Sequence, residues 1–226
     1  MSELQMKRPP KHIIETFKKY NAPNISDALD ILHIKSGIYG INPLSVPTKI
    51  VGPAITMRMT AAGETKAKSH GCANAFRVAE DGDVIVIDNG GREGENCWGE
   101  IVAFAALQKG VIGTVVDGFV RDVDVLKEIN YPVFARGVTL TTSRGRTIEE
   151  SFNTVVRIGN VQVRPGDIIV ADENGVVVIP SERVEEVLKV TQQVYDKEQY
   201  IIAQIKKGVS FENVDRETGY DKMLDR

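Results

Sequence analysis

Hydrophobic residues recur with helical spacing near the start of the chain. Ile13 and Phe17 stand four positions apart within residues 11–20, which predicts an amphipathic helix. Apolar residues in 28–32 indicate a second short helix, and we expect Asn24 or Ser26 to cap it. The first 33 residues therefore predict a pair of helices that pack on a larger unit.

Between residues 84 and 135, short apolar runs alternate with helical segments. Four apolar residues in a row, Val84 to Ile87, indicate a strand that is buried on both faces. This alternation predicts parallel strands joined by crossover helices. The expected elements are a strand within 54–60, a short helix at 73–79, strands at 84–88, 112–117 and 132–135, and helices at 100–109 and 122–130.

The pattern changes after residue 151. Short apolar runs separated by Gly-Asn, Pro-Gly-Asp and Glu-Asn-Gly predict hairpins, with strands at 155–161, 162–163, 167–171 and 175–179. A long helix is expected from Ser181, as its cap, to about Lys207. The polar tail from Gly208 is expected to be loose or to lie on a partner subunit. We therefore predict one domain over residues 1–226, with N-terminal helices at 10–33, a core at 52–180 and a helical extension at 181–226.

Composition narrows the function classes. A chain of 226 residues with a net charge of −3 and no basic stripe offers no footprint for nucleic acid. Cys72 and Cys97 form no Cys-x-x-Cys pair, which argues against a structural zinc site or a disulfide framework and fits a reducing compartment. Residues 1–11 lack an apolar segment, and no run approaches the roughly 20 apolar residues that span a bilayer. We expect a soluble, cytoplasmic protein without membrane partners.

A charged pair follows one of the predicted buried strands. The run 113–116 ends at Asp117-Gly118, a pair typical of turns, and Arg121 and Asp122 come shortly afterwards. Ligand sites of α/β proteins commonly lie just past the C-terminal ends of strands. An arginine there can bind a carboxylate with two hydrogen bonds, and an aspartate can bind a hard divalent cation. Alternatively, Asp122 caps the next helix and Arg121 makes a surface ion pair.

A second candidate lies where the preceding strand meets its helix. Residues 89–96 form a glycine-rich loop without Gly-x-Gly-x-x-Gly spacing or a Gly-Lys-Ser/Thr ending, so a nucleotide site is weakly supported. The helix that starts at Gly99-Glu100 presents unpaired N–H groups that can bind an anion, although Glu100 can simply favour the helix dipole. Trp98 either walls this pocket or packs in the core. Because both junctions follow parallel strands, we expect them to face one crevice.

Two further segments carry polar side chains of interest. The loop 61–71 contains Lys66, Lys68 and His70, which could form an anion-binding lid or a solvated loop. His33, at the end of the second helix, is expected to be structural because no carboxylate or cysteine flanks it at metal-ligand spacing.

Several of these motifs together resemble the RraA-like family. The resemblance covers roughly residues 13–208, and it rests on Trp98-Gly99-Glu100, Asp117-Gly118-x-x-Arg121-Asp122, Pro165-Gly166-Asp167 and the segment Ala171 to Pro180. The family includes class II pyruvate aldolases acting on 4-hydroxy-4-methyl-2-oxoglutarate and 4-carboxy-4-hydroxy-2-oxoadipate, regulators of ribonuclease activity, and members once named demethylmenaquinone methyltransferases. The resemblance implies a swivelling β/β/α fold that forms a homotrimer or a dimer of trimers, with sites at subunit interfaces.

The resemblance also implies roles for individual residues. Asp122 matches the metal ligand, for Mg²⁺ or Mn²⁺, and Arg121 matches the residue that contacts pyruvate. Gly99, Glu100, Ile101 and Val102 match the segment that holds the substrate and metal-bound waters, although many members have aspartate or another residue where Glu100 stands. Glu198 is the candidate for a glutamate that a neighbouring subunit's C-terminal helix contributes.

The predicted function is a metal-dependent lyase for 2-oxo acids. Cleaving the C3–C4 bond leaves a pyruvate enolate, which a divalent cation stabilises as a Lewis acid, and oxaloacetate decarboxylation passes through the same enolate. A Schiff-base route requires a desolvated lysine, and no lysine stands in an apolar run near the motif. The alternative is a ring-shaped, non-catalytic regulator that binds an RNA-processing enzyme. Methyl transfer lacks support, because no cofactor fingerprint is present.

Overall fold

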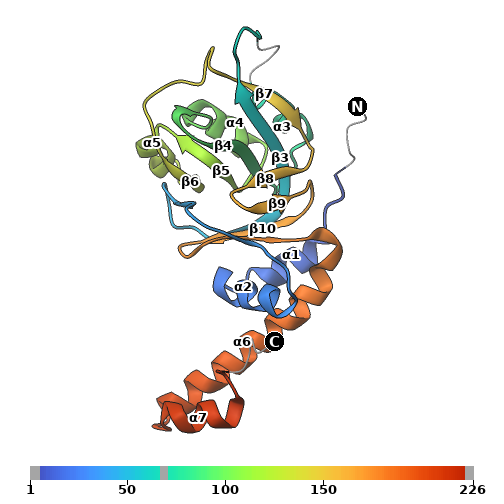
Figure 1. Cartoon of the computed structure of the whole chain (residues 1–226), viewed down its shortest axis with the longest axis vertical. Coiled ribbons are helices and arrows are strands. Elements are labelled where there is room, and N and C mark those ends of the chain that lie inside the picture. Colours follow the sequence, from blue (N-terminus) through green and yellow to red (C-terminus); the bar gives the residue numbers. More distant parts are fainter. Residues whose placement is uncertain (1–5, 67–70, 222–226) are drawn as a thin grey trace.

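The computed structural model describes residues 6–66 and 71–221 and is built around one curled sheet (Figure 1). In the described ranges, the sheet has nine strands in the order β1-β11-β10-β3-β4-β5-β6-β2, and β7 pairs with β3 off this path. Its strands are β1 (Gly37–Ile38), β2 (Asn42–Pro43), β3 (Ile50–Ala61), β4 (Val84–Asn96), β5 (Gly113–Val120), β6 (Val133–Val138), β7 (Thr147–Phe152), β10 (Ile168–Asp172) and β11 (Gly175–Ile179).

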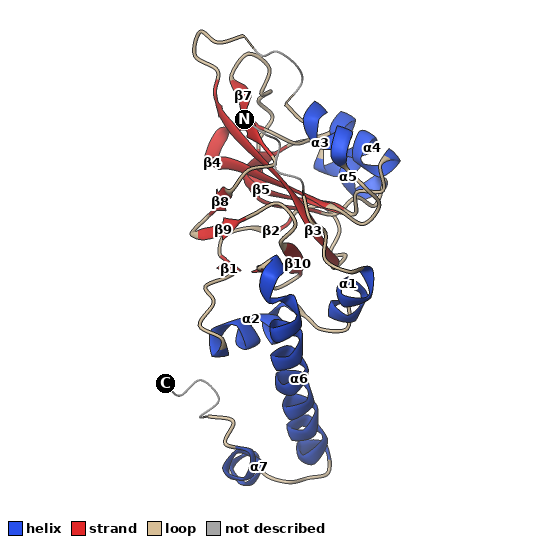
Figure 2. Ribbon diagram, turned by 90° about the vertical axis from the view of Figure 1, so that its right-hand side faces the viewer, coloured by secondary structure: helices blue, strands red, loops and turns tan. Residues whose placement is uncertain are grey.

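The centre of the sheet is parallel, as the alternation of strands and helices predicted. β3, β4, β5 and β6 run parallel, and the crossover helices α3 (Ala73–Val78), α4 (Glu100–Gln108) and α5 (Val123–Glu128) lie together on one face (Figure 2). Ile85, Ile87 and Val116 face these helices and pack with Trp98 and Ala103 in one hydrophobic cluster. The expected crossover arrangement is therefore confirmed.

The other face of the same strands packs against the β10–β11 hairpin and the β8–β9 hairpin. Val84, Val86 and Val115 pack in a second cluster with residues of β10, β11 and the two-stranded hairpin of β8 (Val156–Ile158) and β9 (Val161–Val163). Alternate residues of the apolar run in β4 thus belong to different clusters, and all four are fully buried. The prediction of a strand buried on both faces is confirmed.

A third layer holds the N-terminal helices and the long C-terminal helix. α1 (Lys11–Phe17), α2 (Ala22–Ile31) and the start of α6 (Val184–Lys206) pack on β10 and β11, and the rest of α6 projects away from the sheet (Figure 1). A short 3₁₀ turn, η1 (Ser181–Arg183), precedes α6. In the described ranges no helix is both long and apolar enough to cross a membrane.

Part of the polar tail forms a helix of its own, whereas the sequence pattern from Gly208 predicted a tail that is loose or lies on a partner subunit. α7 (Phe211–Thr218) folds back against α6, where the Tyr200 hydroxyl donates to Glu217 Oε1 at 2.5 Å and Lys197 Nζ donates to Gly219 O at 3.1 Å. The expectation of a loose tail is wrong for residues 211–218, because these two contacts and the buried Val214 hold the helix.

Two predicted breaks in the central strands are wrong. Asp117-Gly118 lies inside β5, and the glycine-rich segment 89–96 continues β4. Asp88, Arg92 and Asn96 pair with three consecutive residues of β5, so residues 89–91 and 93–95 bulge out between these pairs. The glycines of 89–96 therefore belong to a bulged strand and not to a phosphate-binding loop. Asp117 uses its carboxylate within the sheet, where it accepts from Arg136 Nε and, at 2.6 Å, from Gly159 N.

The predicted caps also differ from those observed. Asn21 caps α2 by accepting from Asn24 N at 2.8 Å, and Asn24 accepts in return from Asn21 N at 3.3 Å, so neither Asn24 nor Ser26 is the cap. Ser181 makes no side-chain cap for α6; its N–H donates to Asp167 Oδ1 at 2.9 Å.

Two loop predictions have other outcomes. Residues 147–152 form β7, although the sequence predicted no strand there. Of the predicted loop 61–71, residues 67–70, including Lys68 and His70, lie outside the described residues. His33 is exposed and lies just past the C-cap of α2, with a positive φ of 55°; its expected structural role stays a prediction.

We expect Gly52→Ala to destabilise the fold, because a Cβ at this position would lie 2.1 Å from the carbonyl oxygen of Gly82. The neighbour is backbone and cannot swing away, so the free energy of unfolding should fall by about 1–3 kcal/mol or more. Gly94→Ala is the matched control, since a Cβ at that position would have no neighbouring atom within 4 Å. Urea denaturation measures both, and equal midpoints for the two variants would contradict the prediction.

Burial between α2 and α6, and then the charge of Asp30, raise the pKa of Asp27. Protonated Asp27 therefore favours the folded state at low pH, and this contribution is lost as the pH rises through the raised pKa. We expect Asp27→Asn to increase the free energy of unfolding at neutral pH, with the gain vanishing below about pH 4, the ordinary pKa of aspartate. Denaturation at several pH values, with the exposed Glu128→Gln as control, measures this. A gain independent of pH would contradict it.

Candidate active site

Two neighbouring strand–helix junctions build the candidate site. Trp98-Gly99 connects β4 to α4, and Arg121-Asp122 connects β5 to α5. Cys97 N donates to Phe119 O at 3.1 Å and Arg121 N donates to Trp98 O at 3.0 Å. The two segments therefore stay side by side beyond the last paired residues of β4 and β5. The two predicted groups of residues therefore share one crevice, because both follow parallel strands at the same edge of the sheet.

Gly99 makes this approach possible. A Cβ on Gly99 would lie 2.6 Å from Asp122 Oδ2 and 3.2 Å from Arg121 Cγ. Its φ of −168° is open to any residue, so the requirement for glycine here is one of space and not of backbone conformation. A larger residue would displace the Arg121-Asp122 pair.

Asp122 occupies the N-cap position of α5 but does not cap that helix with its side chain. Its Oδ2 instead accepts from Glu100 N at 3.0 Å and from Arg121 Nε at 3.2 Å. The φ of 57° is left-handed, a conformation that aspartate adopts more readily than most residues. The structural alternative of a side-chain cap is therefore wrong, and among the described residues Oδ1 accepts no hydrogen bond.

The first turn of α4 supplies backbone donors beside this carboxylate. Glu100 N is already taken by Asp122, and the first intrahelical bond runs from Ala103 N to Gly99 O at 3.1 Å. The N–H groups of Ile101 and Val102 lie between these two and have no helical carbonyl to bind. N–H groups in this position can bind an anion, and the exposed Glu100 side chain lies in the same turn.

A pocket of about 50 Å³ connects these groups to a loop that the sequence analysis missed. Three residues of the segment 139–146, between β6 and β7, belong to its lining. The lining is Asn96, Cys97, Trp98, Gly99, Glu100, Ile101, Val102, Arg121, Asp122, Thr142, Ser143 and Arg144. The signal was available, because β6 is the next parallel strand and its carboxyl end lies at the same sheet edge.

Trp98 and Cys97 support the pocket from the core. The Trp98 indole is fully buried and stacks on Tyr131, with ring centroids 6.0 Å apart and planes at 15°. Of the two interpretations of Trp98, core packing is therefore the one observed for its side chain. Burial raises the pKa of the Cys97 thiol well above its usual value, so a thiolate nucleophile is not favoured at neutral pH.

Glu198 is not brought to this pocket within one chain. It lies on α6, at the opposite end of the molecule from α4 and α5 (Figure 1). Its Oε2 accepts from Asn24 Nδ2 at 2.6 Å, and burial, followed by the charge of Asp27, raises its pKa. A role for Glu198 in catalysis therefore concerns the pocket of a second copy of the chain.

The donor set of the pocket fits a hydrated hard cation better than a metal held entirely by protein. In the described ranges no group of three or more His, Cys, Asp or Glu side chains could hold a metal ion. Mg²⁺ commonly keeps several waters and uses only one or two carboxylates, so Asp122 with an available Oδ1 is sufficient.

Comparisons with known proteins agree with this architecture. The family described as RraA-like (Aldolase/RraA) matches residues 22–178. Protein DlpA of Legionella pneumophila is 35% identical over 211 residues, which cover 93% of this chain but 34% of DlpA, so the chain spans about a third of that relative. A protein of Halalkalibacterium halodurans, named a candidate 4-hydroxy-4-methyl-2-oxoglutarate aldolase, is 39% identical over 78% of this chain and 80% of its own.

Solved structures share the fold. An uncharacterised protein from Pseudomonas syringae pv. tomato has a TM-score of 0.83 at 31% identity, over 92% of this chain and 98% of that one. Streptomyces coelicolor RraAS2, described as an unusual member of the RNase ES inhibitor RraA protein family, has a TM-score of 0.75 at 26% identity, over 87% and 96% of the two chains. With its mixed α/β fold, its long C-terminal helix and a family match over most of its length, this chain belongs to the RraA-like family.

Proposed function

We propose that this protein is a divalent-metal-dependent lyase that cleaves 4-hydroxy-2-oxo acids, such as 4-hydroxy-4-methyl-2-oxoglutarate, to release pyruvate. The observation that carries the proposal is the orientation of Asp122. One of its oxygens is fixed by Glu100 N and Arg121 Nε, and the other accepts no hydrogen bond among the described residues. Relatives named as candidate aldolases support the same class of reaction.

In this proposal the substrate carboxylate binds at the N–H groups of Ile101 and Val102, and the Arg121 guanidinium faces the keto oxygen. A divalent cation on Asp122, Mg²⁺ or Mn²⁺, would supply Lewis-acid polarisation of that oxygen. Arg121 adds a fixed positive charge where negative charge develops, and Asp122 fixes the guanidinium through the 3.2 Å ion pair.

Cleavage requires a proton to leave the C4 hydroxyl and another to reach C3. The electron pair of the C3–C4 bond moves to the pyruvate half, C4 becomes a carbonyl carbon, and C3 then takes up a proton. Glu100 in the first turn of α4, and Glu198 from a second copy, are the carboxylates proposed to hold the waters that carry these protons. Oxaloacetate decarboxylation develops the same charge on the keto oxygen and is the expected side reaction.

The lining of the pocket supports this route over a Schiff base. The residues that line it in the described part of the chain include two arginines and no lysine. An imine with the substrate needs a lysine amine within reach of the keto carbon, in a desolvated setting.

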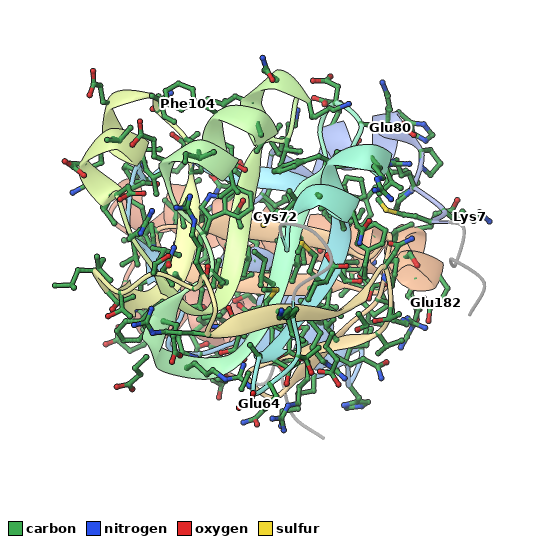
Figure 3. The ribbon with its side chains drawn as sticks, turned by 90° about the horizontal axis from the view of Figure 1, so that it is seen from above. Lys7, Glu64, Cys72, Glu80, Phe104 and Glu182 are labelled. Carbon is green, nitrogen blue, oxygen red and sulfur yellow. The ribbon has the colours of Figure 1, made fainter. Side chains whose placement is uncertain are left out.

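An exposed apolar face on α4 supports assembly into a homotrimer or a dimer of trimers. Val102, Ala103 and Ala106 face the sheet, yet the outer face also carries Ile101, Phe104 and Leu107, which are 66%, 48% and 42% exposed. Phe104 points outward from the helix (Figure 3). A helix that is apolar on all sides is ordinarily covered on all sides. A second copy seated on this face would lie at the rim of the pocket, since Ile101 also lines it.

The similarity to RraAS2 supports a second candidate function, a ring-shaped regulator that binds an RNA-processing enzyme. Such a regulator needs no metal at Asp122. The family match ends at residue 178, before α6 and α7, so this chain carries a helical extension beyond the matched core. Binding of an RNase E-type enzyme to the purified protein, without lyase activity, would favour the regulator.

We expect purified protein to release pyruvate from oxaloacetate with Mg²⁺ and to stop when EDTA is added. Asp122→Asn should lower the metal-dependent rate by about 10²–10³ or more, as loss of one preorganised charge contact typically does. Asparagine tolerates the left-handed backbone at this position, so the variant should fold. A lactate-dehydrogenase-coupled assay measures the rate.

A no-enzyme reaction is the necessary background, because divalent metal alone decarboxylates oxaloacetate. Glu128→Gln, on the exposed side of α5, is the control variant and should keep full activity. An Asp122→Asn protein with unchanged metal-dependent turnover would show that the assignment of the site is wrong.

Contribution of Glu198 by a second copy predicts complementation between two inactive variants. We expect Asp122→Asn and Glu198→Gln each to lose activity alone, whereas co-refolded mixtures should recover about a quarter of the sites when subunits assort at random. The amide introduced by Glu198→Gln keeps an acceptor oxygen for Asn24, so the fold should survive. Activity of the mixture, with light scattering to measure its oligomeric state, is the test. A mixture as inactive as its parents would exclude a site shared between copies.

A further inference from the structure

The loop 139–146 is fastened to both strand–helix junctions of the pocket. Thr139 N donates to Val120 O at 2.9 Å, at the end of β5. Asn96, the last residue of β4, donates from its N–H to Thr141 O at 3.1 Å and accepts from Ser143 N through Oδ1 at 2.9 Å. The loop is therefore fixed by three hydrogen bonds to the strands that position Gly99 and Asp122.

Hydrogen bonds inside the loop give its two arginines different roles. Arg146 N and Thr147 N both donate to Ser143 O, and the Arg146 guanidinium donates through Nη1 to Thr142 O at 3.1 Å. Arg144 contributes its backbone N–H, which donates to Thr142 Oγ1 at 3.3 Å. Arg146 thus stabilises the turn, whereas the Arg144 side chain makes no hydrogen bond or ion pair within the described ranges.

Among the described residues that line the pocket, Arg144 is therefore the cation whose side chain has no hydrogen-bond or ion-pair partner. It lines the pocket and is exposed, while Arg121, the other arginine of the lining, is paired with Asp122. The N–H groups of Ile101 and Val102, at the start of α4, can bind one carboxylate in the same pocket. A guanidinium on a loop that lines the same pocket suits a second carboxylate, which it can bind with two parallel hydrogen bonds.

We propose that Arg144 determines substrate specificity by binding the distal carboxylate of the substrate, so that the pocket selects dicarboxylic 2-oxo acids over monocarboxylic ones. This inference rests on the proposed lyase function for its turnover consequences. The selectivity itself follows from the placement of two anion sites in one pocket and is measurable by binding alone.

Arg144→Met is the informative variant, because methionine keeps much of the side-chain length and removes the charge. With 4-hydroxy-4-methyl-2-oxoglutarate the KM should rise by about 10–100-fold, the range expected for loss of a charge-assisted hydrogen-bonded pair, with a smaller change in kcat. With the monocarboxylate 4-hydroxy-2-oxopentanoate the KM should change by less than about twofold. Arg144→Lys should restore part of the preference. Arg216→Met, which removes an exposed positive charge on α7 away from the pocket, is the control and should leave the preference intact.

A binding measurement separates this inference from the proposed function. Calorimetry compares 2-oxoglutarate with 2-oxopentanoate, which has the same chain length and lacks the second carboxylate. The wild-type protein should prefer 2-oxoglutarate, and Arg144→Met should lose that preference. This result in a protein that cleaves no substrate would overturn the lyase proposal alone. Equal binding of the two acids by the wild-type protein, or a preference unchanged in Arg144→Met, would overturn the role of Arg144.

Discussion

The site depends on one contact between two helix starts, the hydrogen bond from Glu100 N to Asp122 Oδ2. It joins the first turn of α4 to the residue that precedes α5, and it forms only because position 99 has no side chain. The same contact turns the carboxylate away from α5, which it would otherwise cap, and leaves one oxygen for a cation. A helix N-terminus that would attract any anion is thereby divided between an internal carboxylate and free donors for a ligand.

The curled sheet makes this contact possible by aligning three strand ends. β4, β5 and β6 are parallel neighbours, so the segments that leave their carboxyl ends meet at one edge. Buried apolar clusters on both faces fix the strands, and the bulges in β4 carry extra residues while pairing with β5 resumes at Arg92 and Asn96. The chemistry sits where backbone polar groups leave the sheet and need new partners.

Much of this arrangement could be predicted from the sequence, because apolar alternation records which faces of β4 and β5 are buried. The convergence of Gly99, Arg121 and Asp122 follows from the parallel topology alone. What failed was local: Asp117-Gly118 and the glycines of 89–96 have turn-like composition, yet the pairing between β4 and β5 outweighs that preference, helped at Asp117 by the contact with Arg136. The loop at Arg144 was missed because an eight-residue polar segment has no periodicity, and its position depends on Asn96, nearly 50 residues earlier.

The balance of charge in the pocket gives a reason for its third segment, the loop 139–146 that carries Arg144. Arg121 and Asp122 largely neutralise each other at 3.2 Å, and a divalent cation on Asp122 would add positive charge next to the N-terminus of α4. These groups can bind one anionic group, and the remaining lining outside the segment 142–144 offers no further positive charge for a second one. Placing an unpaired guanidinium on a loop tethered to β4 and β5 extends the electrostatic complementarity beyond the reacting carbons. In the proposed lyase, the reaction concerns the junctions after β4 and β5, and the proposed choice of substrate concerns the segment after β6.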